Sequence, residues 1–291
     1  MKRIAFIINP IAGIRKKVDV SELIRRHIDS EAFEYRIYHT EYKGHAQILA
    51  AQAVEEGFDI VAASGGDGTI NEIARALIHT HVSLAILPMG SGNGLARHLG
   101  IPLHIPDALR LINRLQTKRI DTGLFNNAVF LSNAGTGFVA CVAESFDHKK
   151  SFRGFWGYSL QTLKHFFSYK PVNCHITCHD KQWSGYFFTT NACNSNQFGY
   201  EARVAPDARL NDGKLEMVLV RKTTIPSYTL LMFYLFFGNV YRHPSVIHVQ
   251  GTSLHIETDS PVHFQVDGEP LGKNSTFQAQ LNPLSLSVLI P

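Results

Sequence analysis

The order of apolar and polar residues divides the chain into two parts. In the first part, short apolar runs alternate with segments in which apolar residues recur at helical spacing. The apolar runs are Arg3–Asn9, Phe33–Thr40, Phe58–Ser64 and Val82–Gly90, and the helical segments are Val20–Ile28, Gly44–Gly57, Gly65–His79 and Ser91–Ile101. Strands that alternate with helices build a parallel sheet that helices cover on both faces.

From about Asp121 onward the pattern changes to short segments in which apolar and polar residues alternate. Gly, Asn and Asp separate these segments, as they do in proteins rich in hairpins. The segments are Asn127–Gly135, Val172–Asp180, Ser184–Ala192, Lys214–Arg221, Thr252–Asp259 and Val262–Val266. We therefore predict an α/β domain over residues 1–122 and a β-sandwich domain over residues 123–291, with the final residues packing back on the first domain.

Two aromatic segments, Phe152–Tyr169 and Pro226–Tyr241, interrupt the β-rich part and have helical character. Core helices would explain both, but Leu230–Phe237 is an unbroken run of eight apolar residues that also suits contact with lipid.

No apolar run reaches the roughly 18 residues of a membrane-spanning helix. Asn9 and Pro10 end the first apolar run too early for a signal peptide. We expect a cytoplasmic protein that associates transiently with a membrane.

Composition narrows the class of partner. Charged residues make up 18% and hydrophobic residues 45% of the chain, which is typical of a globular protein. The net charge of +4 suits an anionic ligand or membrane surface, and no clustered basic and aromatic pattern indicates nucleic acid.

Cys174 and Cys178, with a histidine after each, are spaced unusually for zinc and fall on one face of a strand, so we favour core residues. The sequence leaves open whether the protein forms a homodimer.

Two glycine-rich loops in the first part share one design. Ser64–Thr69 and Gly90–Gly94 each follow an apolar strand and open a helix. Glycines let the backbone approach a phosphate closely, and the unpaired N–H groups of a helix start point at the anion. Neither loop matches the P-loop or the dinucleotide-binding fingerprint. Tight turns without a ligand are the alternative, which the presence of two such loops disfavours.

Asp67 stands at the centre of the first loop, where a carboxylate makes little sense as a group that binds phosphate. It suits a Mg²⁺ partner or a group that takes a proton from an attacking hydroxyl. A helix N-cap is the structural alternative, and the two roles are compatible.

Seven motifs, in order, resemble the diacylglycerol kinase catalytic family, which includes bacterial lipid kinases and sphingosine kinases. They are Asn9–Gly13, Thr40 with Gly44–Ala46, Ser64–Glu72, Pro88–Pro102, Arg119–Asn126, Pro206–Glu216 and Val266–Glu269. The resemblance covers nearly the whole chain. It implies ATP-dependent phosphorylation of a lipid hydroxyl by an NAD-kinase-like α/β domain and a β-sandwich domain, with the active site in the cleft between them.

The resemblance also implies roles for particular residues. Asp67, Asp267 and Glu269 would be the catalytic acids, with Glu269 as candidate base, and Asp121 would belong to the active-site network. A structural Mg²⁺ would bind Asp212 and the backbone oxygens of Arg209 and Lys214. The residues implied to bind ATP are Asn9, Pro10, Ile11, Ala12, Gly13, Thr40, Gly65, Gly66, Asp67, Gly68, Thr69, Asn71, Glu72 and Ser91.

Two departures from the family pattern bear on the substrate. Gly94 replaces an acidic residue that is common in bacterial members, and Cys141 stands where the family commonly has Asp. An ammonium group buried without a carboxylate is costly, so we favour an uncharged acceptor of the diacylglycerol type at a membrane surface. A sphingoid base is the alternative, because Glu144 lies three residues on and would share nearly the same helix face. An NAD kinase or a non-catalytic nucleotide-binding regulator on the same fold also stays open, although Asn71 and Glu72 disfavour the NAD kinase.

Overall fold

The computed structural model describes residues 1–12, 19–147, 166, 168–196 and 202–291. The chain divides into two compact units, Met1–Ile120 with Leu284–Pro291 and Asp121–Pro283. Two predicted features, the ATP contact Gly13 and most of the helix Phe152–Tyr169, lie outside the described residues.

The first unit is built on a parallel sheet with the strand order β2–β1–β3–β4–β13. In this sheet Ile4 of the second strand, β1, lies opposite Tyr35 on one side and Ile60 on the other. The last strand contributes only its C-terminal end, where Ser287 and Val288 pair with the fourth. The strands are β1 (Lys2–Ile8), β2 (Phe33–His39), β3 (Ile60–Gly65), β4 (Ser83–Pro88) and β13 (Glu269–Leu289).

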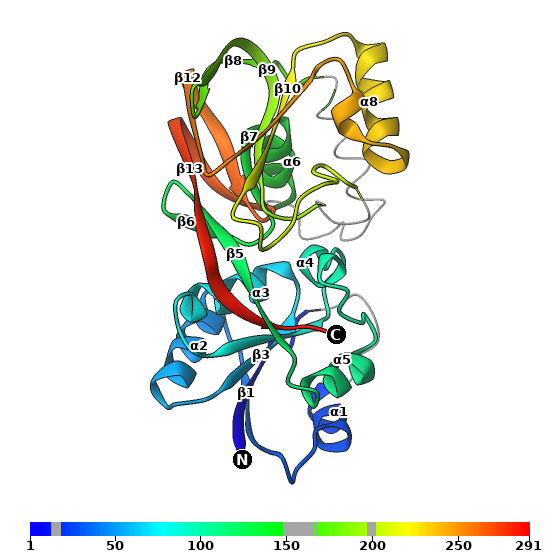
Figure 1. Ribbon diagram of the computed structural model, residues 1–291, viewed down its shortest axis with the longest axis vertical. Helices are drawn as coiled ribbons and strands as arrows, with labels where there is room; N and C mark the ends of the chain where they lie inside the picture. Colours follow the sequence, from blue (N-terminus) through cyan, green and yellow to red (C-terminus); the bar gives the residue numbers. More distant parts are fainter. Residues whose placement is uncertain (13–18, 148–165, 167, 197–201) are drawn as a thin grey trace. The chain divides into compact units, whose positions relative to one another are not determined.

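Helices cover both faces of this sheet (Figure 1). α1 (Val20–His27) packs with α5 (Ile105–Ile112), whereas α2 (His45–Glu55) packs with α3 (Asp67–Leu77). Every residue of β3 and β4 is buried, because each face of these strands meets a helix layer. The short helix α4 (Gly94–His98) follows β4. The alternation of strand and helix thus places four strand ends on one edge of the sheet.

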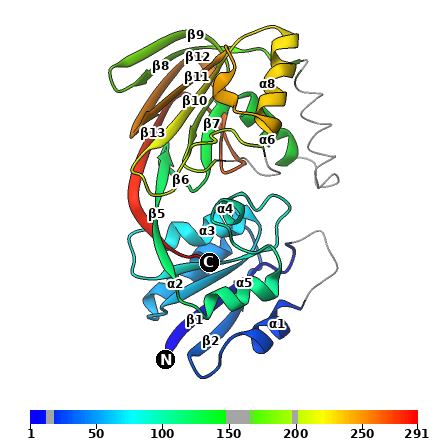
Figure 2. The same ribbon diagram turned by 45° about the vertical axis from the view of Figure 1, so that its right-hand side comes forward.

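The second unit is a sandwich of antiparallel strands in which two long strands bend and serve both layers (Figure 2). β9 and β12 each pair with β8 along one stretch and with β7 along another. The elements are β5 (Thr117–Phe125, which begins in the first unit), β6 (Ala128–Phe130), β7 (Asn133–Gly137), α6 (Phe138–Asp147), β8 (Val172–Cys178), β9 (Lys181–Cys193), β10 (Leu215–Arg221), α8 (Ile225–Phe237), a 3-10 turn (Val240–Arg242), β11 (Val246–Gly251) and β12 (Ser253–Val266).

Aromatic and aliphatic side chains fill the sandwich. The rings of Phe125 and Phe277 stack with centroids 5.7 Å apart. Cys174 and Cys178 belong to this core on the inner face of β8, and burial raises the pKa of the Cys174 thiol to about 12. The fold class predicted from the sequence, an α/β unit with a β-sandwich unit, is confirmed.

The C-terminal end of β13 supplies core side chains to the first unit, so we predict that its packing stabilises that unit. Leu286 is fully buried there. Leu286→Ala should lower the free energy of unfolding by about 2–5 kcal/mol, the usual range for an emptied leucine site. Urea denaturation measures this. Leu103→Ala, at a position that is 42% exposed, is the control and should change stability by less than about 0.5 kcal/mol. Equal stability of both variants would contradict the packing.

Candidate phosphate-binding site

The loops that follow the first four strands lie side by side at one edge of the first unit's sheet. Backbone hydrogen bonds continue the sheet into them. The N–H of Thr40 donates to the Ile8 carbonyl at 2.9 Å, and the N–H of Asn9 donates to the Ser64 carbonyl at 2.9 Å. The N–H of Met89 donates to the Gly65 carbonyl at 2.8 Å. Open parallel sheets bind ligands at this edge, beyond the carboxyl ends of the strands.

The two glycine loops approach each other more closely than side chains would allow. A Cβ atom at position 90 would lie 2.8 Å from the Cα of Gly66 and 2.9 Å from Oδ1 of Asn93. A Cβ atom at position 65 would lie 2.5 Å from Cβ of Thr69. Glycine is therefore required at both positions by contacts within the protein. At Gly68, by contrast, a Cβ atom would meet nothing within 4 Å, so this position faces open space.

The Asp67 carboxylate holds the second loop against the first. Its Oδ2 accepts the N–H of Asn93 at 2.9 Å, and its Oδ1 accepts the N–H of Gly94 at 3.0 Å. Burial raises the pKa of the Asp67 carboxyl, and these two N–H groups oppose the rise by stabilising the charged form. Asp67 is the first residue of α3, whereas Gly66 is its N-cap. The carboxylate thus caps α4 instead of the helix that it begins.

Asn93 shapes the second loop, a role that sequence reasoning missed. It adopts a left-handed conformation with φ of 51° and precedes α4. Its side chain closes a ring with the backbone of Gly90. It accepts the Gly90 N–H at 2.9 Å and donates to the Gly90 carbonyl at 2.8 Å. Arg97 donates from Nε to the Gly92 carbonyl at 3.1 Å. An asparagine between two glycines at a helix start was the available signal, since Asn tolerates the left-handed region.

The other residues predicted to bind ATP gather at this edge with different exposures. Nδ2 of Asn9 donates to Oγ1 of Thr69 at 3.0 Å, which joins the loop after β1 to the first glycine loop. Oε1 of Glu72 accepts the N–H of Gly44 at 3.0 Å, so this carboxylate fixes the start of α2. Buried members are Thr40, Gly65, Thr69 and Asn71; half-buried ones are Asn9, Ala12, Gly66 and Glu72; exposed ones are Pro10, Ile11, Gly68 and Ser91.

In the second unit, Asp267 sits in a ring of backbone N–H groups. Its carboxylate accepts those of Leu131 and Ser132 at 2.8 Å each and that of Asn133 at 2.9 Å. Its backbone has φ of 49°, and Gly268 follows with φ of 83°, which makes a tight turn between β12 and β13. Glu269 is the first residue of β13, half-buried, and pairs with Val266. The Asp267 carboxylate is therefore held by the fold at the turn that leads into Glu269.

Asp121 is fully buried and also binds a loop of the second unit. Its Oδ2 accepts the N–H of Gly213 at 2.9 Å, and its own N–H donates to the Leu210 carbonyl. The side chain of Asn194, which sequence reasoning did not select, donates to the carbonyls of Asp121 and Leu131 at 2.7 and 2.9 Å. Through Asp121, these bonds connect the segment that leads to Leu131 with the loop around Gly213, which carries the predicted metal ligands.

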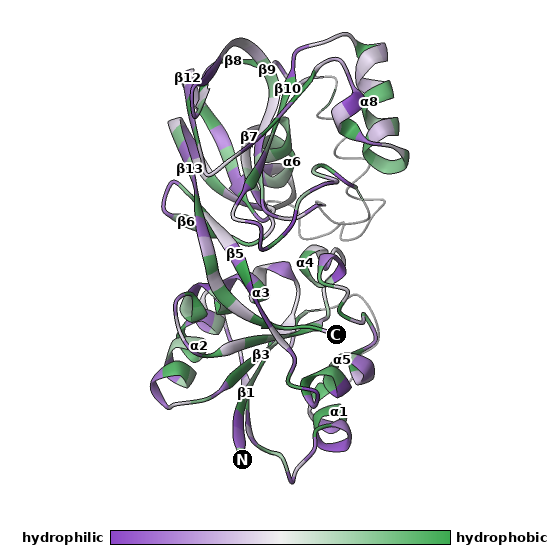
Figure 3. Ribbon diagram, viewed as in Figure 1, coloured by the Kyte–Doolittle hydropathy of each residue, from purple (hydrophilic) through white to green (hydrophobic). Residues whose placement is uncertain are grey.

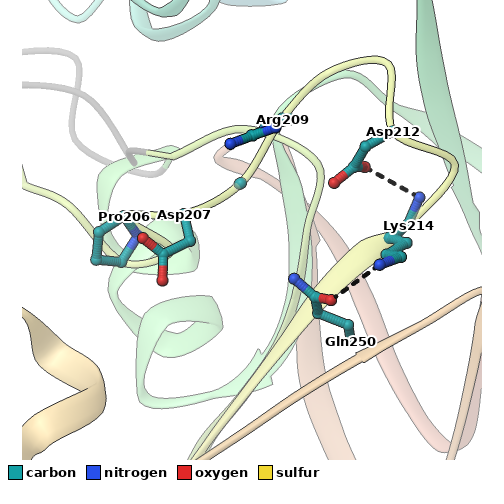
Figure 4. A pocket seen from close by; sticks show the side chains of 7 residues that line it. Pro206, Asp207, Arg209, Asp212, Lys214 and Gln250 are labelled. Atoms are coloured by element: carbon teal, nitrogen blue, oxygen red, sulfur yellow. Dashed lines mark hydrogen bonds between the residues drawn. The ribbon is translucent and has the colours of Figure 1, made fainter.

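That loop borders a pocket in which the predicted Mg²⁺ ligands lie together (Figure 4). Asp207 and Asp212 supply carboxylate oxygens, the ligands that Mg²⁺ prefers. Oδ1 of Asp212 accepts the N–H of Lys214 at 3.2 Å, and Nζ of Lys214 donates to Gln250 at 3.2 Å. Arg209 and Lys214 add positive charge to the same pocket. Across the described part of the chain, His, Cys, Asp and Glu side chains form no group of three or more suited to a metal. Magnesium here stays a prediction.

Comparison with known proteins places the chain in a family. The family model described as diacylglycerol kinase catalytic domain matches residues 3–125, and that of the YegS C-terminal NAD kinase beta sandwich-like domain matches residues 132–290. A diacylglycerol kinase of Staphylococcus epidermidis (strain RP62A) is 30% identical over 279 residues, covering 94% of this chain and 87% of the relative. A diacylglycerol kinase of Staphylococcus aureus (strain Newman) has the same identity and the same coverage.

Solved structures agree in fold. The crystal structure of a diacylglycerol kinase from Bacillus anthracis str. Sterne superposes with a TM-score of 0.77 at 21% identity, covering 100% of this chain and 97% of that chain. A second structure from the same organism reaches 0.84 at 24% identity, covering 100% and 95%. The family models and the sequence relatives together show that this chain belongs to the diacylglycerol kinase catalytic family, a family of lipid kinases. The resemblance read from the motifs is confirmed.

The close approach of the two glycine loops yields a prediction about stability. Gly90→Ala should lower the free energy of unfolding by about 1–3 kcal/mol, the usual range for overpacking, because the added methyl group meets backbone and the Asn93 side chain. Gly68→Ala is the matched control and should leave stability unchanged or slightly raised, because its methyl group enters open space. Thermal unfolding of the two variants measures the difference. If Gly90→Ala were as stable as the parent, the close approach would not be required.

Proposed function

We propose that the protein is an ATP-dependent lipid kinase that transfers the γ-phosphate to the hydroxyl of a lipid of the diacylglycerol type. Membership of the family supports a lipid kinase. The observation that carries the use of ATP is the pair of glycine loops held together by Asp67 beyond the ends of β3 and β4. Loops of this kind offer backbone N–H groups and close approach to a polyphosphate.

The start of α3 is the proposed phosphate-binding position. Gly68 lies in the first turn of this helix, is exposed and has open space where a side chain would be. The N–H groups of a first helical turn have no partner within the helix and carry partial positive charge. Asn9 and Thr69, joined by their side chains, and Ser91 in the second loop supply further polar groups. We assign the Asp67 carboxylate to holding this arrangement in place, next to the transferred group.

Glu269 is the proposed general base for the acceptor hydroxyl. The carboxylate of Asp267 already accepts three backbone N–H groups, so its use as a base would cost those bonds. We therefore assign Asp267 to positioning, because it fixes the turn from which β13 and Glu269 emerge. A kinase also needs a divalent cation to neutralise phosphate charge, and such a cation would suit the oxygen-rich chemistry of these acids. We assign no further step to it.

The environment of α6 supports an uncharged acceptor over a sphingoid base. Burial raises the pKa of the Cys141 thiol, so the thiol stays neutral and offers no countercharge to an amine. Oε2 of Glu144 lies 3.6 Å from Nδ1 of His263, so this carboxylate already has a neighbour. Lys273 adds a positive charge that acts on both Cys141 and His263. The Lys273 charge opposes the attraction that the Glu144 carboxylate would offer a buried ammonium group.

Gly68→Ala tests the proposed phosphate-binding position. Because the variant should remain as stable as the parent, any change in ATP affinity reflects contact between this position and the nucleotide. We expect ATP affinity to fall at least about tenfold, since the methyl group takes space that the phosphates need and restricts close approach of the backbone. Isothermal titration calorimetry measures it. Gln47→Ala, an exposed change on α2, is the control. Parent-like ATP binding by Gly68→Ala would remove this helix start from the site.

Glu269→Gln tests the proposed reaction. Transfer of labelled phosphate from ATP is measured to a diacylglycerol, to sphinganine and to NAD. We expect the parent to phosphorylate the diacylglycerol, and the variant to lose about 10²-fold or more in turnover, the usual scale for a positioned proton-transfer group, with ATP affinity retained. Glu257→Gln, an exposed change on β12, should keep parent activity. Phosphorylation of NAD alone, or near-normal turnover by Glu269→Gln, would refute the corresponding assignment.

A further inference from the structure

The helix α8 in the second unit exposes an apolar surface. None of its thirteen residues is charged. Six of its large apolar side chains are exposed, among them Phe233 at 57% and Phe237 at 80%. A helix on the surface of a soluble protein ordinarily turns polar residues to solvent, whereas α8 shows the colours of apolar residues over much of its length (Figure 3). We call the set Ile225, Leu230, Met232, Phe233, Phe236 and Phe237 the α8 face.

The fold does not need the α8 face to hold the helix in place. The opposite side of α8 is buried through Tyr228 and Leu231, which pack with residues of α6, β9 and β10. The ring of Tyr228 lies 4.3 Å from that of Phe188. At 100° per residue, the six residues of the α8 face fall within an arc roughly 160° wide on the other side of the helix. The helix therefore has one apolar side for the core and a second for another partner.

Positively charged residues flank α8 in the sequence. Arg221 and Lys222 precede the helix, Arg242 follows it, and all three are exposed. The exposed Arg203 lies beside the helix, since its backbone N–H donates to the Leu235 carbonyl at 2.9 Å. Nζ of Lys222 lies 5.4 Å from the ring centroid of Tyr186, which is itself 58% exposed. The sequence has no Asp or Glu between Glu216 and Glu257. An apolar centre with a cationic border matches the surface of an anionic bilayer.

We propose that the α8 face docks the protein on anionic membranes, with its apolar side chains in the interfacial layer and the bordering cations against lipid headgroups. A helix of thirteen residues is about 20 Å long, short of the roughly 30 Å hydrocarbon core, so it lies along the membrane plane. No helix among the described residues is long and apolar enough to cross a membrane. A second copy of the chain suits this face less, because like charges would meet. The inference rests on the proposed function insofar as the acceptor lipid resides in a bilayer.

Vesicle binding tests the docking surface without catalysis. The full chain, without nucleotide, is sedimented with vesicles of phosphatidylcholine alone or mixed with phosphatidylglycerol. We expect binding to the mixed vesicles, and a loss of at least about tenfold in affinity for the double variant Phe233→Gln with Phe237→Gln, because each ring leaves water on docking. Ile48→Gln, at a position that is 55% exposed on α2, is the control. Arg221→Gln with Lys222→Gln should lose the preference for the anionic vesicles.

A second readout locates the contact. Phe237→Trp should shift its fluorescence to shorter wavelength and be quenched by brominated lipid, whereas Ile48→Trp should not. Equal vesicle binding by the parent and the double phenylalanine variant overturns the proposal. Conversion of a dimer into a monomer by that variant, with unchanged vesicle binding, also overturns it and assigns the face to a contact between copies. A chain that docks through α8 but transfers no phosphate to a short-chain, water-soluble acceptor supports the docking surface and overturns only the proposed function.

Discussion

Two hydrogen bonds from the backbone of Asn93 and Gly94 to the Asp67 carboxylate hold the candidate phosphate site together. Bonds to a charged acceptor contribute about 1.5–3 kcal/mol each when they replace water. They draw the second glycine loop against the first until only glycine fits at position 90. The exposed start of α3, the left-handed turn at Asn93 and the start of α4 all depend on this contact. The carboxylate is thus a structural part of the candidate site.

The second unit uses the same device twice. Asp267 gathers three backbone N–H groups, and Asp121 binds the loop that ends at Gly213. In each case an acid in a family motif accepts backbone N–H groups of a neighbouring loop. Asp67, Asp121 and Asp267 are thus acids that fix loops. Substituting a loop-fixing acid changes geometry and charge at once, so activity loss alone does not reveal its role.

The α8 face illustrates a different constraint. An exposed apolar surface has no stabilising role in water, and here the aromatic packing of Tyr228 against Phe188 holds the helix without it. The surface is therefore free to serve an external partner, and the cations around it limit which partner fits. A lipid kinase must reach an acceptor that remains in a membrane, which gives such a surface a use.

The sequence by itself determined the alternation of strands and helices in the first unit, the β-rich character of the second, the two glycine loops and the family, because periodicity and motif spacing are local properties of the chain. It did not predict α5 or β11. Tertiary structure alone decided which atoms those residues use. Asp67 meets Asn93 from 26 residues away, and the Asp267 carboxylate meets Ser132 from 135 residues away. The same holds for Ser287, which pairs with Ser83 in the first unit's sheet. Such contacts follow from how the chain packs, and no local pattern encodes the partner of a buried carboxylate or the strand beside which a chain end will lie.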